Sequence, residues 1–323
     1  MRKTAIVLLN LGGPDSLDAI EPFLMNLFSD KDIFKIPVGQ KLFAKIISNR
    51  RAPKVQKQYE LIGGKSPIND WTEKQRSMLE NELREFNPNI DVYTAMRYWN
   101  PLTKETAGQI ANRNYEKILL LPLYPHYSIS TTGSSFNEWK RVFPSDTENH
   151  IFVNNYYKNT YYIKAINNRI DETLTRFPET ANDIQLVFSA HGTPVSMVNK
   201  GDPYSHQIKE TIELVMKNRN FSHEYHLCFQ SKVGPVKWLE PSTDQMIEKL
   251  AKDGKKNLLI IPISFTSDHV ETLFELNIEY RHVADALDVN NYIVMEGLND
   301  SALFISALKD ITISTLKGES TYL

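Results

Sequence analysis

The feature of this sequence that most restricts its fold is a set of four short apolar runs, each rich in Ile, Leu or Val and followed by turn residues. The runs are Ala5–Leu11, Lys117–Leu123, Ile184–Ser189 and Asn257–Phe265. Runs that are apolar throughout, without polar alternation, are typical of parallel strands covered on both faces. Segments with helical periodicity lie between them, including Thr72–Phe86, Tyr161–Arg176 and Ser242–Lys252. Strands that alternate with helices predict an α/β fold with open parallel sheets.

The four runs form two similar pairs, which indicates an internal duplication. The first and third are followed by Leu11-Gly12-Gly13-Pro14 and His191-Gly192-Thr193-Pro194, and the second and fourth contain LLLPL (119–123) and LIIPI (259–263). We therefore expect two similar domains, residues 1–172 and 173–323. Ligands of open α/β sheets bind beyond the carboxyl ends of the strands, so we expect the site in a cleft between the two domains.

Composition narrows the class of protein. A net charge of −2 over 323 residues gives no indication of a nucleic-acid partner. The single cysteine, Cys228, excludes a disulfide within the chain and a four-cysteine metal site, and it favours a cytoplasmic location. The apolar run after Lys3 is short and is interrupted by Asn10, so we interpret it as a buried strand and not as a signal peptide. No stretch approaches the roughly 20 apolar residues of a membrane span.

Two groups of titratable residues follow apolar runs. His191 comes at the end of the third run, where an imidazole can act as a general base, although a histidine that merely closes a loop fits the same position. After the fourth run, Glu271, Glu275 and Glu279 are spaced as one stripe of a helix, preceded by Asp268 and His269. Such a stripe is either a solvated surface or a set of groups that binds a divalent metal or passes protons.

A second unusual segment is Phe34–Lys57, which contains seven basic and no acidic residues. The basic residues are Lys35, Lys41, Lys45, Arg50, Arg51, Lys54 and Lys57. Leu42, Phe43, Ile46 and Ile47 would share one face of a helix there. This pattern fits either a helix on an anionic membrane or ligand, or a core helix with solvated lysines.

Neither Gly64-Lys65-Ser66 nor the turn after Leu11 completes a nucleotide-binding motif, so no nucleotide cofactor is predicted.

Seven strings of the sequence, in order from Leu9 to Tyr280, resemble ferrochelatases. They are LNLGGP, QYELIGGKSP, MRYWNP, YPHYSISTTGSS, FSAHGTPVSMVNKGDPY, FQSKVGPVKWL and SFTSDHVETLFELNIEY. The resemblance implies two Rossmann-like domains, each a four-stranded parallel sheet flanked by helices. It also implies a lyase that inserts ferrous iron into protoporphyrin IX to form protohaem, the terminal step of haem biosynthesis.

The resemblance also implies roles for particular residues. His191 and Glu271 match the catalytic pair, and together with His269 and Glu275 they match groups that accept protons or bind the metal. Further residues are implied to hold the porphyrin. The macrocycle pocket is implied to be lined by Leu11, Tyr124, Trp238 and Phe265. Arg51 and Ser66 are implied to hold the propionates, and Arg97 with Tyr98 is implied to lie deeper in the site. In this family the helix that begins near Glu271 can contain a π-turn, which would alter the spacing of the stripe.

Some departures from the family pattern carry further expectations. Ile129 stands where some members have a cysteine ligand of an iron–sulfur cluster, so we expect no permanent cofactor, with Fe²⁺ as a substrate only. The short segment after Leu308 lacks the extension through which some relatives dimerise, so we expect a monomer. Phe34–Lys57 corresponds to the lip of the pocket, which implies peripheral contact of a cytoplasmic protein with the inner membrane surface.

Three alternatives remain open at the level of sequence. A ferrochelatase acting on coproporphyrin III is the nearest, but members of that branch often have tyrosine at the position of Leu11. A chelatase that loads cobalt or nickel into another tetrapyrrole fits the pocket motifs less well. A non-catalytic tetrapyrrole-binding protein could use the same architecture, but it would have no need of a proton acceptor such as His191.

Overall fold

The computed structural model describes residues 3–34, 36–144, 146–231, 236–320 and 322–323. The chain divides into two compact units, the first formed by Met1–Tyr156 with Ile305–Leu323 and the second by Tyr157–Phe304. No helix within the described ranges has both the length and the apolar character needed to cross a membrane.

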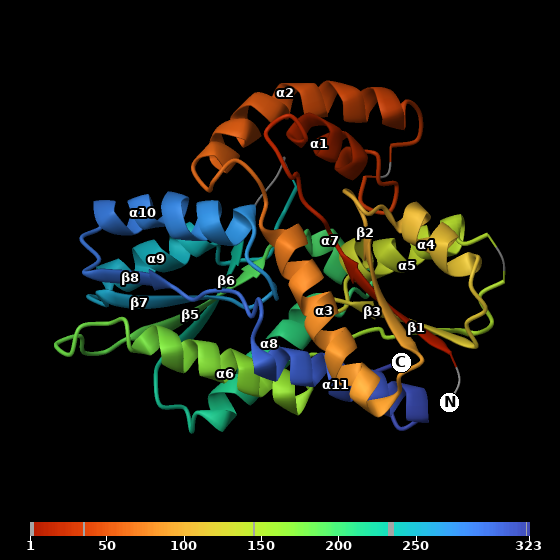
Figure 1. The fold of residues 1–323 in the computed structure, drawn as a ribbon. Helices are drawn as coiled ribbons and strands as arrows, with labels where there is room; N and C mark the ends of the chain where they lie inside the picture. Colours follow the sequence, from red (N-terminus) through yellow and green to blue (C-terminus); the bar gives the residue numbers. More distant parts are fainter. Residues whose placement is uncertain (1–2, 35, 145, 232–235, 321) are drawn as a thin grey trace. The chain divides into compact units, whose positions relative to one another are not determined.

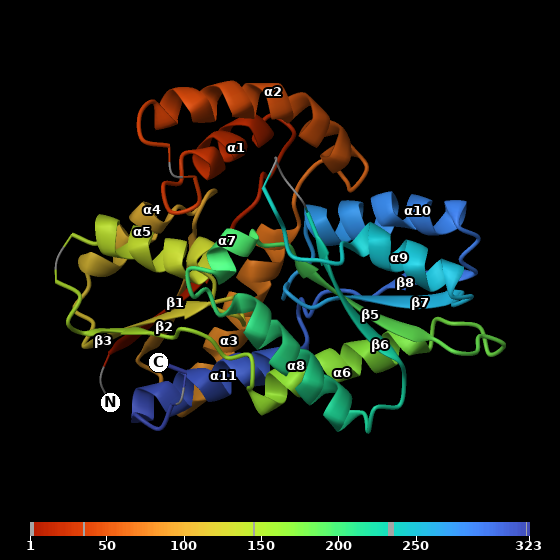
Figure 2. The same ribbon diagram turned by 180° about the vertical axis from the view of Figure 1, so that it is seen from behind.

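The first unit contains a four-stranded parallel sheet of β1 (Thr4–Asn10), β2 (Ile90–Met96), β3 (Lys117–Pro122) and β4 (His150–Phe152), in the order β2-β1-β3-β4. Helix α3 (Ile68–Phe86) and the terminal helix α11 (Ala302–Lys317) lie on one face, and α4 (Thr103–Ala111) and α5 (Ser134–Val142) on the other (Figures 1 and 2). Ala5, Val7 and Leu9 pack with Phe136 and Trp139 of α5, so this face of β1 is core.

Two further helices and one short π-helix complete the first unit. Helix α1 (Ile20–Phe28) packs against α2 (Gln40–Glu60), and the π-helix η1 (Ile129–Gly133) leads directly into α5. The basic segment predicted from sequence therefore forms α2, although Lys35 lies outside the described residues.

The second unit repeats this architecture with β5 (Gln185–His191), β6 (Tyr225–Gln230), β7 (Asn257–Pro262) and β8 (Asn291–Val294). Its parallel strands have the equivalent order β6-β5-β7-β8. Helices α6 (Thr160–Leu174) and α8 (Tyr204–Asn218) cover one face, while α9 (Thr243–Lys252) and α10 (Tyr280–Ala286) cover the other (Figures 1 and 2). The short helix α7 (Val195–Val198) follows β5, and the π-helix η2 (Glu271–Glu279) precedes α10.

The four apolar runs form the central strands β1, β3, β5 and β7, which confirms the predicted parallel α/β architecture. These strands are almost entirely buried because helices cover both of their faces. The remaining strands each have a single strand neighbour. β2 mixes buried and half-buried residues, and β4 is only three residues long, so neither has the continuous apolar pattern used in the prediction.

The division of the structure differs from the predicted boundary after residue 172 in two respects. Helix α6 belongs to the second unit, where its buried Ile163, Ile166 and Ile170 form an apolar stripe and the helix packs against α8. The chain from Ile305 onward returns to the first unit, where Lys309 pairs with Glu82 at 2.7 Å. The cleft between the predicted domains stays a prediction.

Candidate active site

His191 is the last residue of β5 and leads into a tightly packed turn. The next residue, Gly192, donates its backbone N–H to the carbonyl of Gln230 at 2.7 Å. A Cβ atom at Gly192 would lie 2.6 Å from that carbonyl oxygen and 3.2 Å from the ring of Trp238, so no larger residue fits here without a shift. The histidine side chain itself is 39% exposed, which leaves its imidazole accessible to a ligand.

The carboxylate of Glu271 lies between two imidazoles. Its Oε2 atom is 3.8 Å from Nε2 of His191 and 3.8 Å from Nε2 of His269. Nδ1 of His269 lies 3.1 Å from the carbonyl oxygen of Ser267, and because a carbonyl only accepts, this nitrogen carries the hydrogen. The Nε2 atom of His269 is therefore directed toward Glu271 in a side chain that is almost wholly buried.

The electrostatics of Glu271 favour its anionic form. Burial alone would raise the pKa of Glu271, but its electrostatic interaction with His191 and the interactions with His269 outweigh this effect and hold the pKa below its ordinary value. Oε2 is buried and makes no hydrogen bond with any residue that the structure describes. An ionised carboxylate with such an oxygen directed at an imidazole is suited to stabilising a positive charge that develops on that imidazole.

Glu275 has the opposite tendency. Burial and the nearby charge of Glu271 raise the pKa of Glu275, although the hydrogen bonds from Ser231 counteract them. Ser231 donates its backbone N–H to Oε1 at 2.8 Å and its hydroxyl to Oε2 at 2.6 Å, and Tyr280 donates its hydroxyl to Oε1 at 3.2 Å. Two neighbouring carboxylates with pKa values moved in opposite directions are typical of sites that hold and pass protons.

The predicted α-helical carboxylate stripe needs correction. Glu271 to Glu279 form a π-helix, in which each backbone N–H bonds five residues back. The i, i+4 spacing of the glutamates in the sequence does not distinguish a π-helix from an α-helix. Glu279 is exposed and lies outside the cluster. A π-turn here agrees with the expectation from the family resemblance.

Asp268 is occupied in supporting the backbone. Its carboxylate accepts hydrogen bonds from Thr272 at 2.9 Å, from the backbone N–H of Gly297 at 3.1 Å and from the side chain of Asn299 at 2.7 Å. Its place beside His269 in the sequence makes Asp268 a candidate for an additional carboxylate of the site. The structure instead gives it the role of joining the start of η2 to the segment that follows β8.

Two aromatic residues, Phe265 and Trp238, lie beside the turn formed by His191 and Gly192. The ring of Phe265 is edge-on to His191, with centroids 6.3 Å apart, and to His269, with centroids 4.5 Å apart. Trp238 is half-buried, and its Nε1–H is buried without a hydrogen-bond partner among the described residues. Of the matched string FQSKVGPVKWL, residues 232–235 lie outside the described part of the chain.

Four predicted residues of the first unit, Leu11, Ser66, Arg97 and Tyr98, lie near the carboxyl ends of β1 and β2. The turn after Leu11 is held by Asn69, which exchanges two hydrogen bonds with the backbone of Gly13 at 3.0 and 2.7 Å. Ser66 is 3% exposed and donates its backbone N–H to Pro14 at 2.8 Å. A Cβ atom on Gly13 would fall 2.5 Å from Ser66, so this serine packs closely against the turn. Its contact with a propionate stays a prediction.

Arg97 and Tyr98 converge on Asp30, a residue with no motif in the sequence that marks it. Arg97 forms an ion pair with Asp30 at 2.9 Å, and the hydroxyls of Tyr98 and Ser134 both donate to the same carboxylate at 2.5 Å. Burial works against ionisation of Asp30, but these donors and the Arg97 charge lower its pKa overall. Tyr98 is 1% exposed, so its hydroxyl serves this network.

The other two predicted residues of this unit have different surroundings. Tyr124 follows β3 and is half-buried, and burial raises the pKa of its hydroxyl. Arg51 is exposed on α2, where its guanidinium lies 5.6 Å from the ring centroid of Phe28.

The predicted apolar face of α2 is not the face that this helix buries. Its buried residues are mainly small, including Ala44, Ser48 and Ala52, whereas Leu42 is 64% exposed and Ile46 is 44% exposed. Small side chains allow α1 and α2 to approach closely, which leaves the larger apolar residues outside. The outer surface of α2 therefore combines apolar side chains with exposed Lys41 and Lys45.

In the described part of the chain, no group of three or more His, Cys, Asp or Glu side chains is arranged to hold a metal ion. Nε2 of His191 and Nε2 of His269 each approach Oε2 of Glu271 only to 3.8 Å. The four predicted metal residues therefore do not form a closed resident metal cage.

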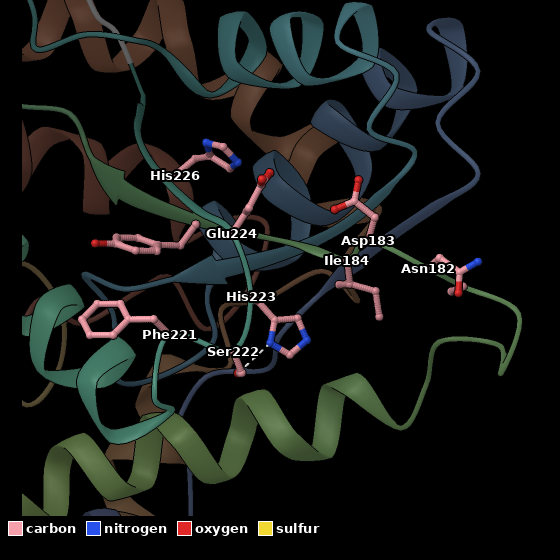
Figure 3. Close-up of a pocket in the computed structure, with 10 residues that line it drawn as sticks. Asn182, Asp183, Ile184, Phe221, Ser222, His223, Glu224 and His226 are labelled. Carbon is pink, nitrogen blue, oxygen red and sulfur yellow. Dashed lines mark hydrogen bonds between the residues drawn. The ribbon is translucent and has the colours of Figure 1, made fainter.

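A separate cavity of about 840 Å³ lies at the amino ends of β5 and β6 (Figure 3). It is lined by residues 181–184 and 221–226. Asp183 and Glu224 at this cavity both pair with Lys255 at 2.9 Å, so one lysine partly compensates the two carboxylate charges. The cavity is at the opposite strand ends from His191, and ligands of open α/β sheets bind at the carboxyl ends.

Comparisons with known proteins agree with this arrangement. The ferrochelatase of Geotalea uraniireducens is 46% identical over 321 residues, which cover 98% of this chain and 99% of the relative. That of Citrifermentans bemidjiense is 47% identical over 319 residues, with 98% and 99% covered. The family model described as ferrochelatase matches residues 3–316. The chain belongs to the ferrochelatase family.

This membership confirms the predicted activity, insertion of iron into protoporphyrin in haem biosynthesis, and the predicted class of enzyme, a lyase. Solved structures confirm the chelatase-like fold. SirB from Bacillus subtilis with Fe³⁺ has a TM-score of 0.58 at 13% identity, covering 99% of this chain and 98% of that one. CbiX has a TM-score of 0.52 at 10% identity, with 98% and 99% covered.

Proposed function

We propose that this ferrochelatase uses His191 to accept the pyrrole protons of protoporphyrin IX, with Glu271 as the anionic partner of His191. The observation that carries the proposal is the 3.8 Å approach between Nε2 of the accessible His191 and Oε2 of Glu271. The reaction converts porphyrin and Fe²⁺ into haem and two protons. Each proton moves from a pyrrole nitrogen to the imidazole, and the resulting imidazolium faces a carboxylate that is already ionised.

His191 must lose the first proton before it accepts the second. Glu275 supports this step because its raised pKa makes it a better proton holder than Glu271, four residues earlier in the same π-helix. His269 is buried on the other side of the Glu271 carboxylate and helps to keep that carboxylate ionised. In this account the two glutamates have different roles, charge stabilisation for Glu271 and proton passage for Glu275.

Iron binding by these residues is transient in this proposal. The porphyrin supplies four nitrogen ligands in the product, so the protein needs to offer only a few donor atoms during delivery. His191, His269, Glu271 and Glu275 are imidazole and carboxylate ligands, which accept several divalent ions. A strongly bound resident metal would compete with transfer to the macrocycle.

We propose that the enzyme needs no iron–sulfur cluster and acts as a monomer. The single cysteine, Cys228, is fully buried in β6, where burial raises the pKa of its thiol to about 12. A buried, protonated thiol is a poor cluster ligand, because the thiolate is the form that binds metal.

The outer surface of α2 supports peripheral membrane contact. Leu42 and Ile46 are exposed beside Lys41 and Lys45, and Val38 just before the helix is 87% exposed. Apolar side chains flanked by lysines bind anionic lipid surfaces by combining burial with charge attraction. We propose that this surface attaches a cytoplasmic enzyme to the inner membrane, from which an apolar porphyrin is drawn.

The substrate assignment can be tested by anaerobic turnover with Fe²⁺, comparing protoporphyrin IX with coproporphyrin III by absorbance. Faster formation of protohaem is expected, and Leu11→Tyr is expected to shift the preference toward coproporphyrin. Faster insertion into coproporphyrin by the unaltered enzyme would overturn the assignment to protoporphyrin. Binding of porphyrin without insertion into either would instead favour a binding protein.

A further inference from the structure

The backbone of His191 has an unusual set of hydrogen-bond partners. The last backbone bond between β5 and β7 runs from Ile263 N–H to the carbonyl of Ser189 at 3.2 Å. β7 ends at Pro262, so the ladder does not continue to His191. The His191 N–H instead donates to the hydroxyl of Ser264 at 2.9 Å. A side chain thus replaces the strand at the residue that carries the imidazole.

The carbonyl of His191 is bonded by a second side chain. The hydroxyl of Tyr204, at the start of α8, lies 3.2 Å from this carbonyl oxygen and 2.6 Å from Oγ of Ser264. A carbonyl can only accept, so the Tyr204 hydroxyl donates to His191 and the Ser264 hydroxyl donates to Tyr204. Three hydrogen bonds then form a closed ring from the His191 N–H through Ser264 and Tyr204 back to the His191 carbonyl.

The two side chains in this ring of hydrogen bonds, Tyr204 and Ser264, are each held by further contacts. Tyr204 is 8% exposed, and its backbone N–H donates to the side chain of Asp202 at 3.0 Å, which fixes the first turn of α8. Ser264 immediately precedes Phe265, whose ring lies against both His191 and His269. A shift of Ser264 would therefore move the His191 backbone and the aromatic ring between the two histidines together.

We infer that Ser264 and Tyr204 are positioning residues that hold the imidazole of His191 at its 3.8 Å distance from Glu271. This inference rests on the proposed role of His191 as proton acceptor. Neither hydroxyl needs to contact the porphyrin or iron. Loss of either one opens the ring, frees one polar group of the His191 backbone and lets the imidazole move relative to Glu271. Because misplacement of a reacting group slows the chemical step, kcat is the quantity affected.

The test compares Ser264→Ala, Tyr204→Phe and the double variant with unaltered enzyme in anaerobic iron insertion. Each single variant is expected to lower kcat about tenfold, with KM for protoporphyrin and equilibrium porphyrin binding changed less than about twofold. The double variant should be little worse than either single variant, since one break already opens the ring. Ser264→Thr retains a hydroxyl and should recover most of the lost kcat.

Tyr157→Phe is the matched control. The Tyr157 hydroxyl donates to Glu210 of α8 at 2.7 Å, so this variant also removes a hydroxyl bonded to α8. It leaves intact the ring of hydrogen bonds around the His191 backbone. Unchanged kcat is expected for Tyr157→Phe, and thermal unfolding separates misfolding from misplacement in every variant. An equal loss of kcat in this control would overturn the inference, because the effect would then be general to α8.

His191→Ala distinguishes failure of the inference from failure of the proposed function. In the His191→Ala background, adding Ser264→Ala should change residual insertion less than about twofold, because no imidazole remains to be positioned. Normal kcat in both Ser264→Ala and Tyr204→Phe, with an inactive His191→Ala, would overturn the inference alone. Near-normal insertion by His191→Ala would overturn the proposed role of His191, and the inference with it.

Discussion

Oε2 of Glu271 lies 3.8 Å from Nε2 of His191, and the electrostatic interaction with this imidazole contributes to holding the pKa of Glu271 below its ordinary value. In the proposed reaction, the ionised Glu271 carboxylate faces the imidazolium that forms each time His191 accepts a pyrrole proton.

Glu271→Gln is expected to lower kcat by about 10²–10³-fold, because the amide keeps the shape of the side chain but cannot stabilise the imidazolium. Porphyrin binding should change little, since the substitution leaves the aromatic side chains in place. Anaerobic iron insertion and porphyrin fluorescence titration measure the two quantities separately. A glutamine variant with normal kcat would show that the carboxylate charge is dispensable.

Glu275→Gln should raise the thermal stability of the protein at neutral pH. The folded state raises the pKa of Glu275 above its ordinary value of 4.5, so folding favours the protonated form, which the amide mimics. The wild-type protein loses this contribution as the pH rises through the raised pKa. The difference in Tm between variant and wild type should therefore be near zero below pH 4.5 and grow above it.

Thermal unfolding of the Glu275→Gln variant and the wild type across this pH range measures the sign of the Tm difference and its change with pH. Glu279→Gln is the matched control, because Glu279 is exposed on the same π-helix and should show no comparable growth in the Tm difference. A variant that became less stable than wild type as the pH rose would contradict the assigned direction of the Glu275 pKa shift.

Asp30→Ala should destabilise the protein by about 3–5 kcal/mol, because it leaves the nearly buried guanidinium of Arg97 without its main partner. Asp32→Ala provides the control. Asp32 also pairs with an arginine, Arg141, but both side chains are partly exposed, so a cost of only about 0–1 kcal/mol is expected. Urea unfolding gives both values. Equal costs for the two substitutions would mean that the Asp30 network contributes no more than a surface pair.

Gly192→Ala should lower stability by about 1–3 kcal/mol and reduce turnover, because the new Cβ would overlap the Gln230 carbonyl next to His191. Gly108→Ala is the opposite case. Gly108 lies inside α4, where an added Cβ would meet no atom of another segment within 4 Å, so alanine should stabilise the helix by about 0.5–1 kcal/mol. Denaturant unfolding and iron insertion together test this pair, and a harmless Gly192→Ala would argue against close packing at the turn.

Leu42→Glu combined with Ile46→Glu should weaken binding to anionic lipid vesicles by at least about tenfold, since both apolar burial and charge attraction are lost. Phe221→Glu introduces a carboxylate at a similarly exposed aromatic residue outside α2 and should bind as the unaltered protein does. Vesicle sedimentation measures both. Unchanged sedimentation of the double variant would exclude α2 as the membrane surface.

The central strands could be predicted from sequence, and His191 and Glu271 could be named as candidates there, because each carries a local signal. β1 and β7 are continuous apolar runs, and His191 and Glu271 follow such runs. Asp30, Ser264 and Tyr204 carry no comparable signal, because their roles depend on hydrogen bonds between segments far apart in the chain. The sequence left open which face of α2 is buried, because packing through Ala44, Ser48 and Ala52 uses small residues that carry no strong apolar signal.

The most direct test of the account is anaerobic Fe²⁺ insertion into protoporphyrin IX by the unaltered enzyme and by His191→Ala, with porphyrin binding measured on the same samples. The account predicts that His191→Ala binds porphyrin with an affinity within about threefold of the unaltered enzyme but forms almost no protohaem, a loss of at least about 10²-fold in kcat. Protohaem formation by His191→Ala at a near-normal rate would contradict it.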